Sequence, residues 1–243
     1  MSGLTINAGI ERHEDLMEDV IKEFEIKLPA RDFIEKAHNV FEMVRTSDNG
    51  VSKLRNLEGQ CKKIIEEILP IASFLGYFER PGLILYCQYH TGNQNYDARL
   101  FCDGPLVGRG YSKEYYLEVT VAQHENEHLV RECLEKGIAC FGPLGITSTG
   151  TINSVTRKIE SKPCVSDPQE TIDRHLRYIK ERIEAKQKKE YKSDTFLIVS
   201  LSTDTVLMKE ELLGIFQQVG NLDYSPFCGL FLVDHLSYQK VLF

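Results

Sequence analysis

The sequence predicts an α/β protein in which helices flank a central sheet. Residues 82–89, 96–102 and 115–121 form runs rich in apolar and aromatic residues, which are typical of strands. The carboxy-terminal half then alternates helix, strand, helix and strand, as α/β domains do. With 243 residues, 42% of them hydrophobic, the chain is long enough for one large domain with a real core.

Charge and cysteine content exclude several classes of protein. The net charge of −7 gives no overall basic surface, so any contact with nucleic acid must be local. The seven cysteines form no Cys-x-x-Cys pair, which argues against a zinc ribbon and a disulfide framework. The amino terminus lacks the features of a signal peptide, and no apolar run approaches the ~20 residues that span a bilayer. We therefore expect a cytoplasmic protein with no membrane partner.

Two amphipathic helices are predicted near the amino terminus, at residues 13–25 and 30–45, where apolar side chains recur at helical spacing. Residues 47–50, Ser-Asp-Asn-Gly, then form a turn. We assign residues 1–50 to an amino-terminal helical extension and residues 51–243 to the α/β domain. The two helices could pack on each other, on the core, or on a second subunit or partner protein.

A third helix is predicted from about residue 53 to residue 69, and Pro70 ends or kinks it. Glu58 and Glu67 each lie one turn from apolar positions of this helix. Glutamates on the surface of a helix are ordinarily solvated and have no further role, and this is one interpretation of Glu58 and Glu67. A role as metal ligand is the other, and it depends on the strands that follow.

A carboxylate interrupts the apolar run at residues 115–121. Glu118 and Thr120 point to one face of this strand, and its apolar residues point to the other. If the strand pairs with residues 96–102, Asp97 lies close to Glu118, and their oxygens could hold a hard divalent cation such as Mg²⁺. The alternative for Asp97 is a strand-entry residue that bonds a loop amide.

Asp97 followed by Glu118-Val119-Thr120 on the next strand resembles the core of the PD-(D/E)XK, or restriction-endonuclease-like, nucleases. In that family an Asp begins one strand of a hairpin and a Glu-x-Lys lies on the next strand. Here Thr120 stands in the place of the lysine. The resemblance covers residues 55–140 best, and it implies a restriction-endonuclease-like fold with a mixed central sheet flanked by helices.

The resemblance also implies a set of site residues. Asp97 and Glu118 would bind Mg²⁺ or Mn²⁺, joined by a glutamate from the preceding helix, Glu58 or Glu67. The metal would activate a water that hydrolyses a phosphodiester. The implied catalytic residues, which bind the metal or lie near the mouth of the site, are Asp97, Glu118, Thr120 and Gln123.

The function that this resemblance implies is a magnesium-dependent nuclease, either an endonuclease or an exonuclease, that acts on DNA in preference to RNA. Restriction, phage defence and repair are all compatible settings. The net negative charge of the chain and the missing motif lysine also permit a second function. In it, the protein is a nuclease-like module that binds a partner or assembles with one without cleaving nucleic acid. Many nucleases of this kind act as dimers, and the amino-terminal helices offer a surface for one.

A second motif, His124-Glu125-x-x-His128, has the letter pattern of zinc metalloproteases. Histidines four residues apart share a helix face, and the glutamate can activate water. The motif lies at the start of the helix predicted at residues 122–137, and no third ligand stands at a familiar distance downstream. A zinc protease is therefore a remote alternative.

Residues 167–189 are predicted to form the most basic helix of the chain, beginning at the capping sequence Asp-Pro-Gln-Glu. Basic residues next to a metal site suit a phosphate backbone. The alternative is a solvated helix whose positive charges interleave with glutamates. The predicted nucleic-acid contacts are Arg177, Lys180, Lys188 and Lys189.

The remaining elements are predicted from their apolar patterns. Residues 138–141 read as a short strand. The Gly, Ser and Thr content of residues 142–161 favours a loop, with a strand near residues 150–155 as the alternative. Two apolar strands and an amphipathic helix between them complete the chain, at residues 195–201, 209–219 and 228–234.

Overall fold

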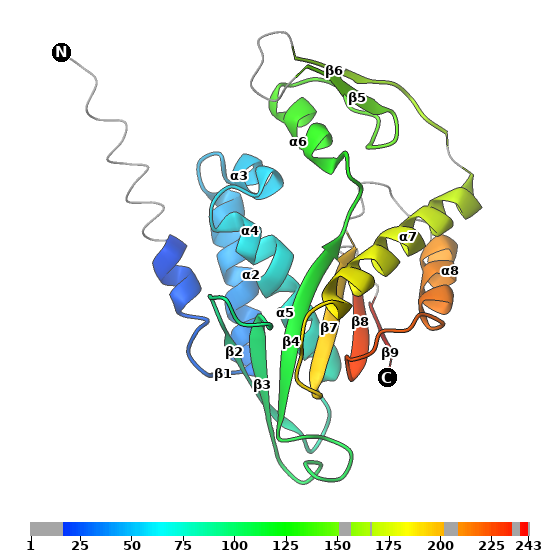
Figure 1. Ribbon diagram of the computed structural model, residues 1–243. Helices are drawn as coiled ribbons and strands as arrows, with labels where there is room; N and C mark the ends of the chain where they lie inside the picture. The colour runs from blue at the N-terminus through cyan, green and yellow to red at the C-terminus, as the bar shows by residue number, and fades with distance from the viewer. Residues whose placement is uncertain (1–16, 151–156, 166, 202–208, 235–238, 243) are drawn as a thin grey trace, which may run out of the picture.

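The computed structural model describes residues 17–150, 157–165, 167–201, 209–234 and 239–242. In this part of the chain, a seven-stranded sheet stands between helices on both of its faces (Figure 1). The predicted α/β class, with a mixed central sheet flanked by helices, is therefore confirmed. No helix in these ranges has both the length and the apolar character needed to cross a membrane.

The sheet combines antiparallel and parallel pairs. The pairs β4–β7 and β7–β8 are parallel, and the other neighbours are antiparallel. The strands lie in the order β1 (Leu28–Pro29), β2 (Ile84–Tyr89), β3 (Ala98–Asp103), β4 (Glu114–Ala122), β7 (Thr195–Leu201), β8 (Gly229–Asp234) and β9 (Gln239–Leu242). The five longer strands predicted from the sequence are present, with small shifts at their ends, and β4 lies at the centre of the sheet.

The helices form two layers. α2 and α5 pack together on one face of the sheet, whereas α7 and α8 lie on the other (Figure 1). A short helix at residues 17–22 precedes them. The labelled helices are α2 (Ala30–Thr46), α3 (Gly50–Asn56), α4 (Cys61–Lys63), η1 (Ile64–Ile68), α5 (Leu69–Phe78), α6 (Glu127–Glu135), α7 (Pro168–Gln187) and α8 (Lys209–Val219).

The helix predicted at residues 53–69 is wrong in its bounds. α3 ends at Asn56, and Leu57 adopts a left-handed backbone conformation (φ 54°) that begins a turn. The chain then continues as one helical rod through α4, η1 and α5, past Pro70 to Phe78. η1 is a π-helical turn, and its wider spacing just before Pro70 accommodates the proline ring and its missing N–H.

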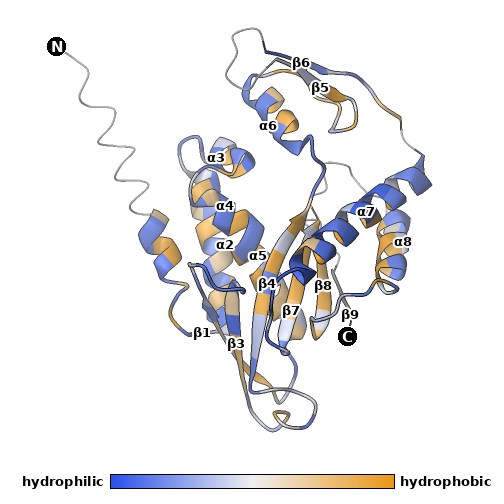
Figure 2. Cartoon of the chain, in the orientation of Figure 1, coloured by the Kyte–Doolittle hydropathy of each residue, from blue (hydrophilic) through white to orange (hydrophobic). Residues whose placement is uncertain are grey.

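Two apolar cores lie on the two faces of the sheet, and β7 contributes to both. Phe196 and Ile198 pack in the core under α5, whereas Leu197 and Val199 pack in the core under α7 and α8. A strand that is buried on both faces needs a continuous apolar run, which is the pattern the sequence shows at this strand. The helix α7 that covers it is hydrophilic along its outer surface (Figure 2).

The amino-terminal helices share the core of the sheet. Phe33 of α2 and Phe74 of α5 are both fully buried in the same apolar cluster. The division of the chain at residue 50 stays a prediction, but the described residues on its two sides pack together. Residues 1–16 of the predicted extension, including the start of the helix predicted at 13–25, lie outside the described residues.

A small lobe stands apart from the main sheet (Figure 1). It consists of α6 and a two-stranded antiparallel sheet of β5 (Ile146–Thr149) and β6 (Lys158–Ser161). Its own apolar cluster joins Leu129 and Cys133 of α6 to Ile146 of β5. The lobe is inserted between β4 and α7, so the chain leaves the main sheet after β4 and returns with α7.

The predictions for this insertion need correction. The helix predicted from residue 122 begins only at Glu127, because β4 extends to Ala122. No strand forms at residues 138–141: α6 ends at Glu135, Gly137 adopts a left-handed backbone conformation (φ 67°), and the chain then turns into the lobe rather than back to the main sheet. The predicted loop at residues 142–161 contains β5 and β6. The alternative strand near 150–155 falls almost wholly outside the described residues.

Candidate functional site

Three carboxylates from three different elements come together beside β4. Asp97 lies immediately before β3, Glu118 lies in the middle of β4, and Glu67 lies in η1. The backbone N–H of Asp97 donates to the carbonyl of Leu117 at 2.8 Å, next to the pair formed by Ala98 and Leu117. The predicted pairing of the two strands is confirmed, and it places Asp97 beside Glu118.

Asp97 is fixed at the end of the β3–β4 pair by its own side chain. Its Oδ2 accepts a hydrogen bond from the backbone N–H of Val119 at 2.7 Å. The pKa of Asp97 is raised to about 7, mainly by burial and then by the negative charges of Glu118 and Glu67. The Val119 N–H and the ammonium of Lys186 oppose this shift. The alternative prediction for Asp97 was a hydrogen bond to the amide of a loop. Asp97 does bond a backbone amide, but that amide belongs to Val119 of β4.

Glu67, rather than Glu58, is the helical glutamate that the structure brings to Asp97. The hydroxyl of Tyr89, a buried residue of β2, donates to Glu67 Oε2. Burial raises the pKa of Glu67, and the Tyr89 hydroxyl opposes this effect. Glu58 is exposed in the turn before α4, where it accepts from the side-chain amide of Asn56 at 3.3 Å.

Glu118 is buried, with 4% of its surface exposed, and its side-chain partners come from far along the chain. The ammonium of Lys186 forms an ion pair with Glu118 Oε1, and the hydroxyl of Tyr191 donates to the same oxygen at 3.2 Å. Lys186 lies in the last turn of α7, which contacts β4. This contact was not predicted from the sequence. Its only signal was the spacing of four between Lys186 and Arg182, which places both on one face of the helix.

A cleft of about 250 Å³ opens beside the carboxylates, between the α4–η1 segment and α7. Glu67, Thr120 and Gln123 line it, so two of the predicted catalytic residues lie next to a predicted metal ligand. Lys62 of α4 and Arg182 of α7 line the same cleft, one from each flanking helix, and Glu66, which also lines it, pairs with Lys62 at 3.8 Å. Sequence reasoning did not single out either basic residue. Basic side chains beside carboxylates suit a ligand that carries phosphate.

The predicted nucleic-acid residues of α7 do not line this cleft. Arg177 and Lys180 lie on the exposed face of the helix and form i,i+4 ion pairs with Glu181 and Glu184, at 4.0 and 3.8 Å. The lysines at residues 188–189 are exposed where α7 ends. For Arg177 and Lys180, the interleaved charges of the alternative prediction are thus present.

The two histidines of the protease-like motif do not share a helix face. His124 precedes α6, and its Nδ1 accepts from the backbone N–H of Asn126 at 2.9 Å. His128 lies in the first turn of α6. Glu127 is 2% exposed and pairs with Arg131 at 2.8 Å. The structure therefore lacks the i,i+4 helical pair on which the zinc-protease alternative depends.

The donor set of the site suits a hard divalent cation. Glu67, Asp97 and Glu118 offer oxygen ligands only, which Mg²⁺ and Mn²⁺ prefer. Within the described ranges, no group of three His, Cys, Asp or Glu side chains is already arranged around one metal position. The residues fit such an ion chemically: burial is the main cause of the raised pKa of Asp97, and the negative charges of Glu118 and Glu67, which a divalent cation would offset, add to it.

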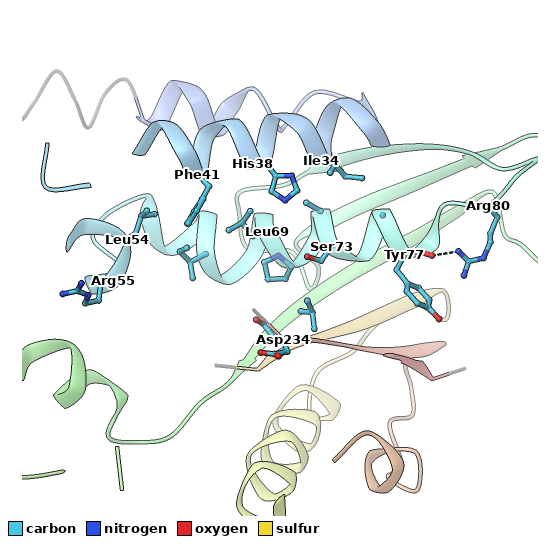
Figure 3. Close-up of a pocket in the computed structure, with 16 residues that line it drawn as sticks. Ile34, His38, Phe41, Leu54, Arg55, Leu69, Ser73, Tyr77, Arg80 and Asp234 are labelled. Atoms are coloured by element: carbon cyan, nitrogen blue, oxygen red, sulfur yellow. Dashed lines mark hydrogen bonds between the residues drawn. The ribbon is translucent and has the colours of Figure 1, made fainter. Parts of the chain in front are cut away.

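A larger cavity of about 1070 Å³ lies elsewhere, between α2, α5 and the end of β8 (Figure 3). Apolar side chains dominate its wall, and His38, Arg55 and Asp234 are among its polar residues. None of the predicted site residues lines it. We therefore place the candidate functional site at the carboxylates and their cleft.

Comparisons of the chain with protein-family models, with curated proteins and with solved structures gave no match. The fold and the site define an α/β protein with a mixed sheet, in which one buried and two half-buried carboxylates lie near a cleft lined by both acidic and basic residues.

Proposed function

We propose that the protein is a cytoplasmic, metal-dependent nuclease of the restriction-endonuclease-like type, which hydrolyses phosphodiester bonds and acts on DNA in preference to RNA. The observation that carries the proposal is that Asp97 interacts with both Glu67 and Glu118, and that Glu67 lines a cleft together with Lys62 and Arg182. Carboxylate oxygens are the ligands of Mg²⁺, and basic side chains next to them suit a phosphate backbone. Restriction, phage defence or repair would be its setting.

The positions of the three carboxylates support the family resemblance. Asp97 begins a strand of a hairpin, Glu118 lies on the next strand, and Glu67 comes from the helical segment before them. The resembled family draws its metal ligands from these same positions. Thr120, in the place of the family's lysine, is the departure.

The chemistry of the proposed reaction divides between the ion and the chain. When bound, Mg²⁺ or Mn²⁺ would neutralise charge on the phosphate and lower the pKa of a coordinated water. Glu67, Asp97 and Glu118 would hold the ion. Lys62 and Arg182 would bind phosphates on either side of the scissile bond, since each helix beside the cleft contributes one of them.

Thr120 and Gln123 are the uncharged polar residues of the cleft. Arg131 Nη2 donates to Gln123 Oε1 at 3.2 Å, which leaves the amide N–H groups of Gln123 as donors for another partner. The Thr120 hydroxyl can both donate and accept. The two side chains would orient the attacking water or the sugar–phosphate backbone.

Cleavage assays test this proposal. Plasmid, linear duplex, single-stranded DNA and RNA would be incubated with Mg²⁺ or Mn²⁺ and with wild-type protein, Glu118→Gln or Glu125→Gln. The last variant is the control, because Glu125 is exposed. We expect metal-dependent cleavage by the wild type and the control, and a loss of at least about 100-fold in Glu118→Gln. No cleavage of any substrate by folded wild-type protein would contradict the proposal.

A nuclease-like module that binds nucleic acid without cleaving it is the second candidate. Two observations favour it: Thr120 replaces the expected lysine, and the ammonium of Lys186 already neutralises Glu118. This candidate predicts binding that is unaffected by Glu118→Gln and no cleavage with any metal. Fluorescence anisotropy with labelled duplex and single strands, run beside the cleavage assay, separates the two candidates.

A homodimer or a partner protein bound through the amino-terminal helices is a further part of the proposal. The inner faces of these helices are used by the core, where Ile21, Phe24 and Phe33 are buried. An interface would therefore use their outer faces, on which Met43 is 42% exposed. Sedimentation equilibrium of wild type and Met43→Glu tests it: the variant should shift any dimer toward monomer.

A further inference from the structure

We propose that Lys186 is the positively charged catalytic residue of this site, and that it supplies from α7 the charge that β4 lacks at Thr120. The proposal rests on the proposed nuclease function and names a residue that the sequence motif does not contain. The proposed role of Lys186 is electrostatic. Its ammonium would donate a hydrogen bond to the phosphate oxygen on which negative charge develops as water attacks.

The position of Lys186 is the first reason for this role. Its ammonium forms an ion pair with Glu118 Oε1, between side chains that are 21% and 5% exposed. Glu118 lies 68 positions earlier in the sequence, on the central strand. By contrast, Arg177 and Lys180 pair with glutamates of their own helix on its outer face. Lys186 is thus a cation of α7 that reaches into the carboxylate cluster.

The geometry of α7 is the second reason. Arg182 lines the cleft, and Lys186 follows it by one helical turn on the same face. Thr120 lines the same cleft from β4, and its side chain lies on the face of the strand that carries Glu118. Lys186 itself does not line the cleft, but its ammonium lies at Glu118, two residues before Thr120 on the same face of β4.

Stability alone explains this ion pair poorly, which is the third reason. Burying an ion pair is costly in desolvation and is often no better for stability than apolar packing. Here the pair involves a carboxylate that Tyr191 also bonds, in a cluster with Asp97 and Glu67. In the metal-free protein Lys186 acts as an internal counter-ion. A divalent cation that takes over Glu118 would free the ammonium for the phosphate.

Moving the charge back to β4 tests the proposal. The variants are Lys186→Met, the double variant Thr120→Lys/Lys186→Met, and Lys113→Met as a control on an exposed lysine just before β4. We expect Lys186→Met to reduce cleavage by about 100-fold and Lys113→Met to change it by no more than about 2-fold. The double variant should recover at least about 10-fold of the lost activity.

Binding of Mn²⁺, measured by titration calorimetry without nucleic acid, gives a readout that does not depend on cleavage. If Lys186 is an internal counter-ion, its removal leaves Glu118 free for the metal, so Lys186→Met should bind Mn²⁺ several-fold more tightly than wild type. If the ion pair only holds the structure together, Lys186→Met should bind Mn²⁺ more weakly than wild type, because Glu118 would no longer be held in place. Circular dichroism checks folding, and Lys186→Gln takes the place of Lys186→Met if that variant does not fold.

The outcomes separate the two proposals. If Lys186→Met cleaves as fast as the wild type, or binds Mn²⁺ more weakly than the wild type, the role of Lys186 is overturned. The nuclease proposal is left standing in both cases. A wild type that cleaves none of the substrates would overturn the nuclease proposal itself, and the role of Lys186 with it. Loss in Lys186→Met with recovery in the double variant supports both.

Discussion

Asp97 and Val119 are joined across the edge of β4, where Asp97 Oδ2 accepts the Val119 N–H at 2.7 Å. The last pair of the β3–β4 ladder joins Ala98 to Leu117, two residues before Val119, so β4 runs on from Glu118 to Ala122 without β3 beside it. The carboxylate thus takes a backbone donor that a longer β3 would have bonded. The same side chain lies where the β3–β4 pairing ends and belongs to the carboxylate cluster, and its hydrogen bond to Val119 fixes its position before any ligand arrives.

Asp97→Asn should make stability less sensitive to pH. The pKa of Asp97 rises from its ordinary value of 3.8 to about 7 on folding, so the folded state holds this proton more tightly than the unfolded state. The stability that the proton provides is complete below about pH 4 and is lost as the pH rises through about 7. Between these limits the wild type should lose up to about 4 kcal/mol that Asp97→Asn retains.

Urea denaturation at a series of pH values measures this difference. Asp103→Asn is the matched control, because Asp103 lies on the same strand and is exposed. The control should follow the wild type. The same pH dependence in wild type and Asp97→Asn would show that the buried carboxyl titrates normally and would contradict the electrostatic description of the site.

Tyr89→Phe should lower the free energy of unfolding by about 1–3 kcal/mol, because it leaves the half-buried carboxylate of Glu67 without its hydroxyl donor. Tyr86→Phe, on the opposite face of the same strand, should change it by less than about 0.5 kcal/mol. Chemical denaturation of the three proteins at pH 7.5 provides the comparison. Equal stability of wild type and Tyr89→Phe would mean that the hydrogen bond is not formed in solution.

Binding of nucleic acid should depend on the basic residues of the cleft more than on those of the outer face of α7. The plot of log K against log salt concentration should become less steep by about two in Lys62→Gln/Arg182→Gln, because each substitution removes one cation that binds a phosphate. Arg177→Gln/Lys180→Gln is the control with the same charge change. Anisotropy titrations in Ca²⁺, from low to high salt, give the slopes. A larger effect in the control would move the binding surface to the outer face.

Phe74→Ala should lower the free energy of unfolding by about 3–5 kcal/mol, the usual cost of deleting a large buried ring. Phe74 lies at the centre of an aromatic cluster, with the rings of Phe78, Phe196 and Phe231 at 5.1, 5.1 and 5.3 Å. Phe141→Ala is the control, because Phe141 is 62% exposed in the small lobe. Thermal and urea denaturation should show a large loss in the first variant and almost none in the second.

The sequence predicted the strands well because their patterns are local. The run at 115–121 alternates apolar and polar side chains around Glu118, and the two strands that carry Asp97 and Glu118 pair as expected. The left-handed Leu57 had no such signal, because this conformation is one that non-glycine residues rarely adopt. Pro70 misled the prediction, because the π turn before it was not visible in the pattern.

The candidate site was predicted in part for a similar reason. Asp97 and Glu118 are neighbours through a hairpin, which sequence spacing reveals. The contact of Lys186 with Glu118 depends instead on how α7 crosses the sheet, and the inserted lobe separates the two residues in the sequence. The choice of Glu67 over Glu58 required knowing where α3 ends, since that break turns Glu58 away from the site.

Binding of Mn²⁺ to the free protein tests the central claim most directly. Titration calorimetry at pH 7.5 would compare wild type, Asp97→Asn and the control Asp103→Asn. The proposed function predicts binding to wild type and Asp103→Asn, and loss of that binding in Asp97→Asn, because Asp97 is the shared ligand at the centre of the cluster. Wild-type protein that binds no Mn²⁺, or Asp97→Asn that binds it as wild type does, would contradict a metal site at these carboxylates.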